Sequence, residues 1–134
     1  LRDMIRGRWE WPDQERVLVQ TMMAEPNVEH GVEKALHGIA AVQSLLRRPE
    51  LAAISFHGVP AERDKLTRAL PLAARAEQGK VALVRGEWIG AFLDEAVAFT
   101  GEEDAHDDQI DSAAGGLRML MTPRAVEFAP SIWG

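Results

Sequence analysis

Apolar residues along the chain follow two patterns, short runs of four to six residues and longer stretches in which they recur every three or four positions. The short runs indicate strands, and the longer stretches indicate amphipathic helices. Because the two alternate, the pattern favours an α/β layered sheet over a helical bundle or a β-sandwich. Strands are predicted at residues 28–33, 51–56 and 81–84, with residues 1–8 as a candidate edge or hairpin strand.

Five helices are predicted between these runs: one from Pro12 to the Pro26-Asn27 pair, then 34–46, 62–78, 87–99 and about 107–121. Pro71 should kink or restart the third helix, and Gly79 has the position of a C′ glycine that ends it. Small residues at 112–116 would let the last helix approach a sheet closely.

The spacing also predicts which helix faces turn toward a core. Asp94 and Glu95 should lie on the opposite, outer face of the fourth helix. The expected core residues of the first four helices are Val17, Leu18 and Met22; Leu36, Ile39, Val42 and Leu46; Leu66, Leu70 and Ala73; and Trp88, Phe92, Ala96 and Phe99.

Length and composition limit the function classes. A chain of 134 residues fits one domain, and the absence of cysteine excludes disulfides, thiol nucleophiles and thiolate zinc sites. No window resembles a secretory signal or a membrane span, so a protein of the cytoplasm is expected. The net charge of -6 argues against nucleic-acid binding by bulk electrostatics alone. Contact with DNA would need divalent cations or a basic partner domain.

The run HDDQIDSA at residues 106–113 is the strongest chemical signal. Asp107, Asp108 and Asp111 lie within one and a half turns of a helix start, and their mutual repulsion would be relieved by a hard divalent cation. The alternative is that acidic residues there cap the helix and meet its dipole, which accounts for Asp107 and Asp108 but not for Asp111. His106 could orient a carboxylate or a water beside them.

A second carboxylate, Glu33, ends the predicted strand 28–33 just before a helix. Ends of strands are where α/β sheets place their sites, so Glu33 is a candidate ligand. The alternative is a solvated charge at a strand-helix junction. His30 and His37 lie nearby, and isolated histidines of this kind are more often structural.

Four stretches in this order and spacing resemble the C-terminal nuclease domain of phage terminase large subunits. They are HGVEKALHG (30–38), DKLTRALP (64–71), GKVALVRGEW (79–88) leading to Phe92, Leu93, Asp94, Glu95 and Phe99, and HDDQIDSA (106–113), and the resemblance covers roughly residues 3–120. It implies an RNase H-like fold, a mixed central sheet flanked by helices.

The resemblance also implies a carboxylate site for two Mg²⁺ or Mn²⁺ ions. Glu33 would be the middle acidic ligand and the Asp107, Asp108 and Asp111 cluster the last, with Asp108 and Asp111 favoured. Glu33, Asp108 and Asp111 would be catalytic. The basic residues Lys34, Lys65, Arg68 and Arg85 would contact phosphates; the alternative for Lys65 and Arg68 is surface pairing with Glu62 and Asp64.

The family's first strand carries an essential aspartate, and it should precede Leu1, so the domain at 1–121 is expected to be N-terminally incomplete, with a tail at 122–134. The implied function is a metal-dependent endonuclease that cleaves concatemeric double-stranded DNA in a bacterial host cell. Implied partners are the terminase ATPase domain, the small terminase subunit and the portal protein; no membrane is involved. The alternatives are a catalytically inactive docking remnant of a prophage terminase and a resolvase-type nuclease outside a packaging motor.

Overall fold

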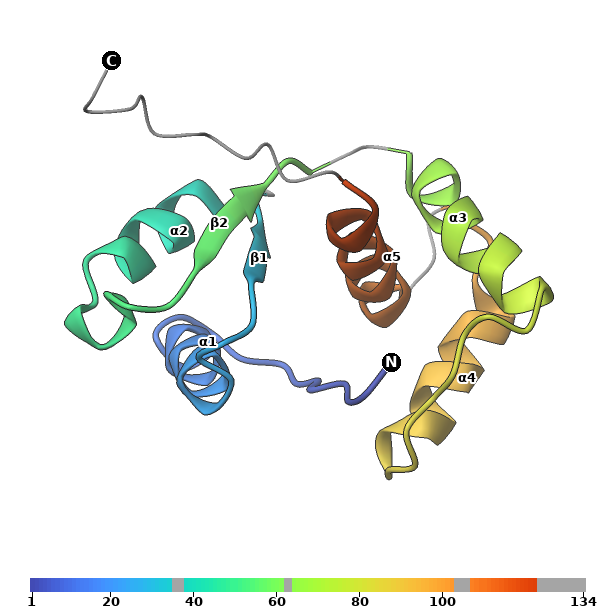
Figure 1. The fold of residues 1–134 in the computed structure, drawn as a ribbon, viewed down its shortest axis with the longest axis horizontal. Helices are drawn as coiled ribbons and strands as arrows, with labels where there is room; N and C mark the ends of the chain where they lie inside the picture. Colours follow the sequence, from blue (N-terminus) through green and yellow to red (C-terminus); the bar gives the residue numbers. More distant parts are fainter. Residues whose placement is uncertain (35–37, 62–63, 103–106, 123–134) are drawn as a thin grey trace, which may run out of the picture.

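The computed structural model describes residues 1–34, 38–61, 64–102 and 107–122, and the structural statements below concern these residues. Their order is α1 (Asp13–Ala24), β1 (His30–Glu33), α2 (Gly38–Leu46), a 3₁₀ turn η1 (Pro49–Leu51), β2 (Phe56–Val59), α3 (Lys65–Glu77), α4 (Trp88–Ala98) and α5 (Asp108–Met121) (Figure 1). The α/β class predicted from the sequence is therefore confirmed.

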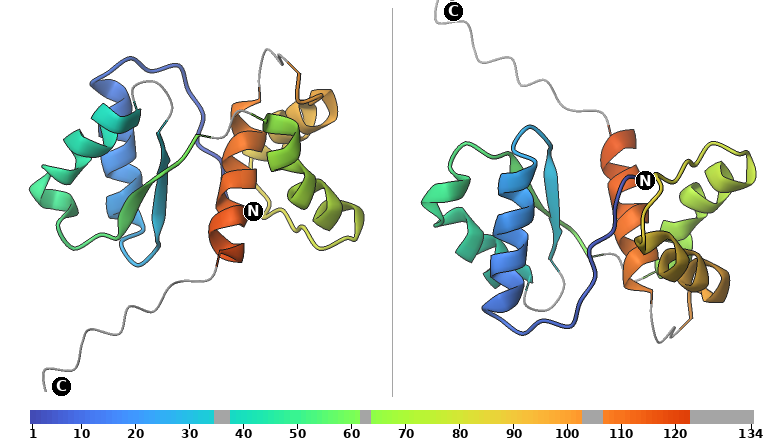
Figure 2. Two further views of the ribbon diagram at one scale, coloured as in Figure 1. Left: turned by 90° about the horizontal axis from the view of Figure 1, so that it is seen from above. Right: turned by 90° about the horizontal axis from the view of Figure 1, so that it is seen from below.

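The two strands form a parallel pair in which His30 lies opposite Phe56 and Glu33 lies opposite Val59. Parallel strands need a crossover connection, and α2 supplies it. Figure 2 shows α1 and α2 beside the strand pair, whereas α5 stands between the strands and the α3-α4 layer. Glu33 thus ends a strand whose neighbour in space is α5.

One hydrophobic core holds the strand half together. It is centred on Val19, Met22, Leu45 and Leu51, all buried, with Leu45 completely inaccessible. Partly buried Val32 and Phe56 bring the two strands onto this core. Burying such side chains contributes about 1.5–3 kcal/mol each, so α1, α2 and η1 fix the position of β1.

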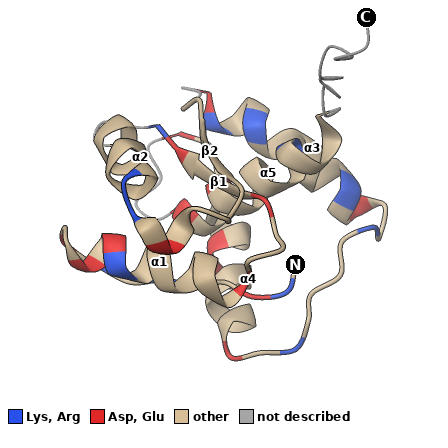
Figure 3. Ribbon diagram, turned by 60° about the vertical axis from the view of Figure 1, so that its left-hand side comes forward, with Lys and Arg blue, Asp and Glu red and all other residues tan. Residues whose placement is uncertain are grey.

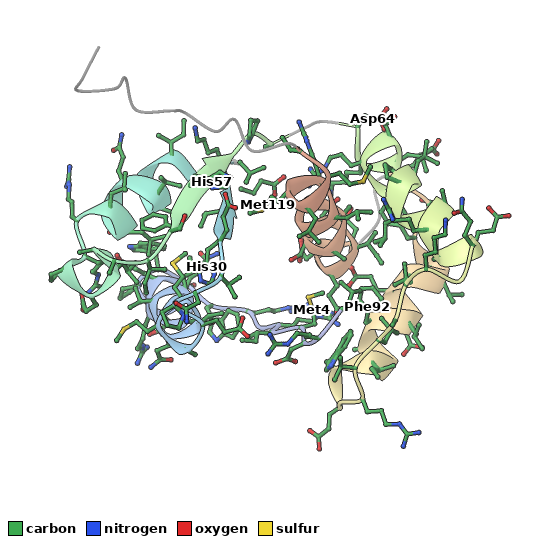
Figure 4. All side chains as sticks on the ribbon, viewed as in Figure 1. Met4, His30, His57, Asp64, Phe92 and Met119 are labelled. Atoms are coloured by element: carbon green, nitrogen blue, oxygen red, sulfur yellow. The ribbon has the colours of Figure 1, made fainter. Side chains whose placement is uncertain are left out.

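A second core holds α3, α4 and α5 together around buried Ala69, Phe92, Ile110 and Ala113. The chain start belongs to it: Met4 packs against this cluster beside Phe92 (Figure 4). The N-terminal amine of Leu1 donates to the carbonyl of Ala82 at 2.7 Å, and the N–H of Val84 donates to the carbonyl of Leu1 at 2.9 Å. The segment before α1 therefore ties the two halves together.

Two predicted ends agree closely with the structure. The last helix begins at Asp108, one residue from the predicted start, and ends at Met121 as predicted. Gly79 has a φ of 68° and follows α3 as the C′ glycine. Its N–H donates to Ala76 and the N–H of Lys80 donates to Arg75, which is the Schellman arrangement. The helix continues through Pro71 without a restart.

The predicted strand at 51–56 is wrong. Pro49 starts a 3₁₀ turn that buries Leu51 in the first core, and the strand begins only at Phe56. Residues 81–84 are assigned no strand, although they pair with Leu1 through two backbone hydrogen bonds, and residues 1–8 are assigned none either.

Some predicted core faces are also wrong. Leu45, not Leu46, is the buried leucine of α2, and Glu95 is buried although it was expected on the outer face of α4. On α3 the positions that are not exposed are Lys65, Arg68, Ala69, Leu72 and Arg75. The residues expected inside but exposed are Ile39, Leu46, Leu66, Leu70, Ala73 and Ala96. Leu36 lies outside the described residues.

Glu15 is a buried acid in the first half of the molecule, and it links α1 to the end of α2. Its carboxylate accepts from the hydroxyl of Ser44 at 2.6 Å and from Nη2 of Arg48 at 3.0 Å. These hydrogen bonds, that of Arg48 first, hold the pKa of Glu15 below its ordinary value.

Because the folded pKa of Glu15 is depressed, this carboxylate stabilises the fold above the ordinary glutamate pKa of about 4.5 and ceases to do so as the pH falls through the lower folded value. Urea denaturation from pH 7 to pH 3 is therefore expected to show a steeper acid loss in the wild type than in Glu15→Gln. Glu10→Gln, which changes an exposed acid just before α1, should retain the wild-type slope. Parallel curves for wild type and Glu15→Gln would contradict this linkage.

Candidate functional site

A pocket of about 660 Å³ opens between β1, α3 and α5. Its lining includes Glu33 from the strand end, Arg68 from α3, and Asp108 and Asp111 from the first turn of α5. Apolar walls come from the later part of α5 and from α1, and Met119 lies directly over Gly31 of β1 (Figure 4). Glu33, Asp108 and Asp111, predicted from two distant parts of the sequence, thus meet at one pocket, whereas Asp107 is not part of its lining.

The start of α5 is set by a carboxylate from another helix. The backbone N–H groups of Gln109 and Ile110 donate to Oε1 of buried Glu95 at 2.7 and 2.9 Å, and the side-chain amide of Gln109 donates to Oε2 at 2.7 Å. Asp107 has the N-cap position but makes no side-chain cap hydrogen bond. Glu95 therefore does the capping that the alternative interpretation assigned to Asp107, whereas Asp108 and Asp111 lie in the first turn, where the helix dipole favours acidic residues.

Two basic side chains of α3 lie among the acids. Nη1 of Arg68 is 2.9 Å from Oε1 of Glu33, and its Nη2 is 3.8 Å from Oδ1 of Asp111. Lys65 pairs with Asp107 and lies 3.6 Å from Oδ2 of Asp111. Figure 3 shows the basic segments along α3. These basic residues of α3 therefore face the acidic start of α5.

Most charged side chains of this cluster are largely buried, which makes their charges costly to maintain. The side chains of Asp107, Arg68 and Asp111 are only 7%, 12% and 14% exposed, whereas that of Glu33 is 42% exposed. Burial raises the pKa of Asp111, and the negative charges of Asp107 and Glu33 act in the same direction, while Arg68 and Lys65 oppose the rise. Asp107 raises the pKa of Lys65. Arg68 and Lys65 thus offset only part of the cost of burying the negative charge of Asp111.

The carboxylates suit a hard divalent cation in chemistry, since they offer only oxygen ligands. Oδ1 of Asp111 is buried and makes no hydrogen bond within the described structure, although Nη2 of Arg68 lies 3.8 Å away, and such an oxygen suits a cation. However, no three His, Asp or Glu side chains of the described chain converge closely enough to hold a metal ion as they stand. Arg68 and Lys65 lie between them instead.

The remaining predicted residues are dispersed. Lys34 is exposed and its side chain lies over Gly58, and Arg85 is exposed in the segment before α4. Lys65 and Arg68 pair with α5 and β1, while Asp64 caps α3 by accepting the N–H of Thr67 at 3.1 Å. His106, His37 and Glu62 lie outside the described residues.

His30 is a structural residue, because its Nε2 lies 3.0 Å from the carbonyl oxygen of Glu25. This agrees with the prediction from the sequence that an isolated histidine is more often structural than a ligand. A methyl group added at Gly115 or Gly116 would meet no atom within 4 Å, so this pair makes no close approach to the sheet, and buried Ala113 packs in the second core with Ala69 and Phe92. The glycine pair lines the pocket.

Comparison with known proteins gave one finding. A family model described as the terminase RNaseH-like domain matches residues 8–120. The searches of curated proteins and of solved structures returned no match. Within the described part of the chain, no helix has the length and apolarity to cross a membrane.

Proposed function

Because the chain belongs to the terminase RNaseH-like domain family, we propose that it is a metal-dependent endonuclease domain that cleaves concatemeric double-stranded DNA during packaging. One observation carries the proposal: Glu33 and Asp111, 78 residues apart in the sequence, share the guanidinium of Arg68 within a single pocket. Carboxylates brought together from different elements are what a phosphodiester-cleaving metal site requires.

Glu33, Asp108 and Asp111 are the proposed ligands for Mg²⁺ or Mn²⁺, with Asp107 as a further ligand, and Glu33, Asp108 and Asp111 are the proposed catalytic residues. Asp108 is exposed at the pocket wall, and Asp111 has an unsatisfied buried oxygen. Two bound ions would activate water and stabilise the leaving oxygen of the phosphodiester. The chain's own contribution is to hold these acids on two fixed elements, β1 and α5.

The proposed partners follow from the packaging role: double-stranded DNA, the ATPase domain of the terminase, the small terminase subunit and the portal protein, in the cytoplasm of a bacterial host. The net charge of -6 supports a division of labour in which other parts of the motor hold the DNA by its phosphates. His106, Lys34 and Arg85 remain proposed contributors, His106 beside the acids and the two cations at phosphates.

Metal binding separates an endonuclease from an inactive docking module. Thermal unfolding and titration calorimetry with Mn²⁺ are expected to show binding to the wild type, with a stabilisation of about 2.7 kcal/mol at a hundredfold excess over Kd. Asp111→Asn and Asp108→Asn should each weaken the affinity by about tenfold or more, because each removes a charged oxygen ligand. The exposed Asp94→Asn on α4 is the matched control and should bind as the wild type does.

The absence of any Mn²⁺-dependent shift in the wild type would contradict the endonuclease and support the docking module.

The DNA substrate that is cleaved distinguishes a packaging nuclease from a resolvase. Cleavage of linear concatemeric DNA in Mn²⁺, abolished by Glu33→Gln, supports the packaging role, whereas selective cleavage of four-way junctions would support the resolvase.

A further inference from the structure

Arg68 is held in the pocket in an unusual way for a basic residue. Its side chain is only 12% exposed, and its guanidinium reaches carboxylates of two different elements, Glu33 of β1 and Asp111 of α5. Burying a guanidinium is costly unless carboxylates compensate it. The position between Glu33 and Asp111 is therefore already a cation site, filled by a side chain of the same protein.

The contacts of Arg68 with Glu33 and with Asp111 differ in strength. The contact with Glu33 is a hydrogen bond of 2.9 Å, but the Glu33 side chain is 42% exposed, and such pairs contribute at most about 1 kcal/mol. The contact with Asp111 is an ion pair of 3.8 Å that leaves Oδ1 without a hydrogen bond. The guanidinium therefore lies beside the buried Asp111 oxygen without satisfying it by a hydrogen bond.

A divalent cation would compete for the same oxygens. It carries twice the charge and binds carboxylate oxygens at about 2.0–2.6 Å, which is shorter than either contact of Arg68. With the guanidinium in place, no three carboxylates of the described chain converge on one point. An ion in the position of the guanidinium would lie beside Glu33 and Asp111, and Asp108 lines the same pocket.

We propose that Arg68 is the resident counter-cation of this pocket, and that a divalent cation binds by displacing its guanidinium from Glu33 and Asp111. This inference rests on the proposed function, since it concerns the same carboxylates. It makes metal binding an exchange of cations, so the affinity of the pocket for divalent ions is set in part by a residue that does not ligate them. Until the ion arrives, Arg68 offsets part of the negative charge of the acidic cluster.

The test is the Mn²⁺ affinity of Arg68→Gln, Arg68→Lys and wild type, measured by titration calorimetry at constant ionic strength. Arg68→Gln removes the competing charge and is expected to bind Mn²⁺ on the order of tenfold more tightly. Arg68→Lys retains the charge and should stay near the wild type. Arg75→Gln removes a charge from the same helix outside the pocket lining and corrects for long-range electrostatics.

Unchanged or weaker binding by Arg68→Gln, with normal binding by the wild type, would overturn the displacement model and make Arg68 a residue that positions the acids. If neither the wild type nor any of the variants binds Mn²⁺, the proposed function and this inference are both overturned. A second measurement needs no variant: in a Mg²⁺ titration of the ¹⁵N-labelled wild type, the side-chain Nε signal of Arg68 should shift with the same midpoint as metal binding. A stationary signal at saturating Mg²⁺ would contradict displacement.

Discussion

Replacing Glu95 with alanine is expected to lower the free energy of unfolding by about 3 kcal/mol or more, because three donors lose their acceptor at once. The backbone N–H groups of Gln109 and Ile110 and the side-chain amide of Gln109 all donate to this carboxylate, and Gln109 and Ile110 are buried. Each unsatisfied buried donor costs about 1–3 kcal/mol, and water would have to enter the α4-α5 contact to reduce that cost.

Urea denaturation followed by circular dichroism measures this effect directly. Asp94→Ala is the matched control, since the neighbouring Asp94 is exposed, and it should change stability by no more than about 0.5 kcal/mol. Glu95→Gln should fall between the two, because its amide oxygen can still accept from both backbone N–H groups. If Glu95→Ala were as mild as Asp94→Ala, the start of α5 would not depend on this cap.

The burial of Glu95 also shows what the sequence could have revealed. Trp88, Phe92, Glu95 and Phe99 are spaced by four, three and four residues, which is a continuous helix face. The prediction assigned Ala96 to the core face by its spacing and placed Glu95 on the outer face, and charged residues are indeed seldom buried without a partner. The partner is the N-terminus of α5, in the next helix along the chain, and hydrophobic periodicity does not report on such a contact.

Local signals predicted what depends on local structure. Gly79 as the C′ residue of α3 and the extent of α5 follow from capping chemistry and helical spacing, and both agree with the structure. The strand at 51–56 failed because a short apolar run looks alike in a strand and in a buried turn. What decided it was the fit of Leu51 into the core formed by α1 and α2.

The candidate site was accessible from the sequence only as a set of acids. The resemblance and the spacing at 106–113 placed Glu33, Asp108 and Asp111 in one hypothesis, and the structure brings them to one pocket. Lys65 and Arg68 were expected at phosphates or on the surface. Their pairing with Asp107, Asp111 and Glu33 depends on how α3 packs against α5, which is a tertiary property.

The second large loss of stability is expected on truncation of Leu45, and Leu46 beside it is the matched control. Leu45→Ala is expected to destabilise the fold by about 3 kcal/mol, since truncation of a fully buried leucine loses its transfer free energy and leaves a cavity. Leu45 has no accessible surface and packs with Val19, Met22 and Leu51. Leu46 is 66% exposed, so Leu46→Ala should cost no more than about 0.5 kcal/mol.

Chemical denaturation of the two variants shows which face of α2 packs against the core. The sequence pattern placed Leu46 with Ile39 and Val42 on the core side, whereas the structure rotates α2 so that Leu45 enters the core and Leu46 and Ile39 lie outside. The two substitutions remove the same atoms from adjacent positions, so differences in intrinsic helix propensity cancel. A larger loss for Leu46→Ala than for Leu45→Ala would mean that α2 packs through its other face. Because α2 forms the crossover between β1 and β2, that rotation would also move the strand end that carries Glu33.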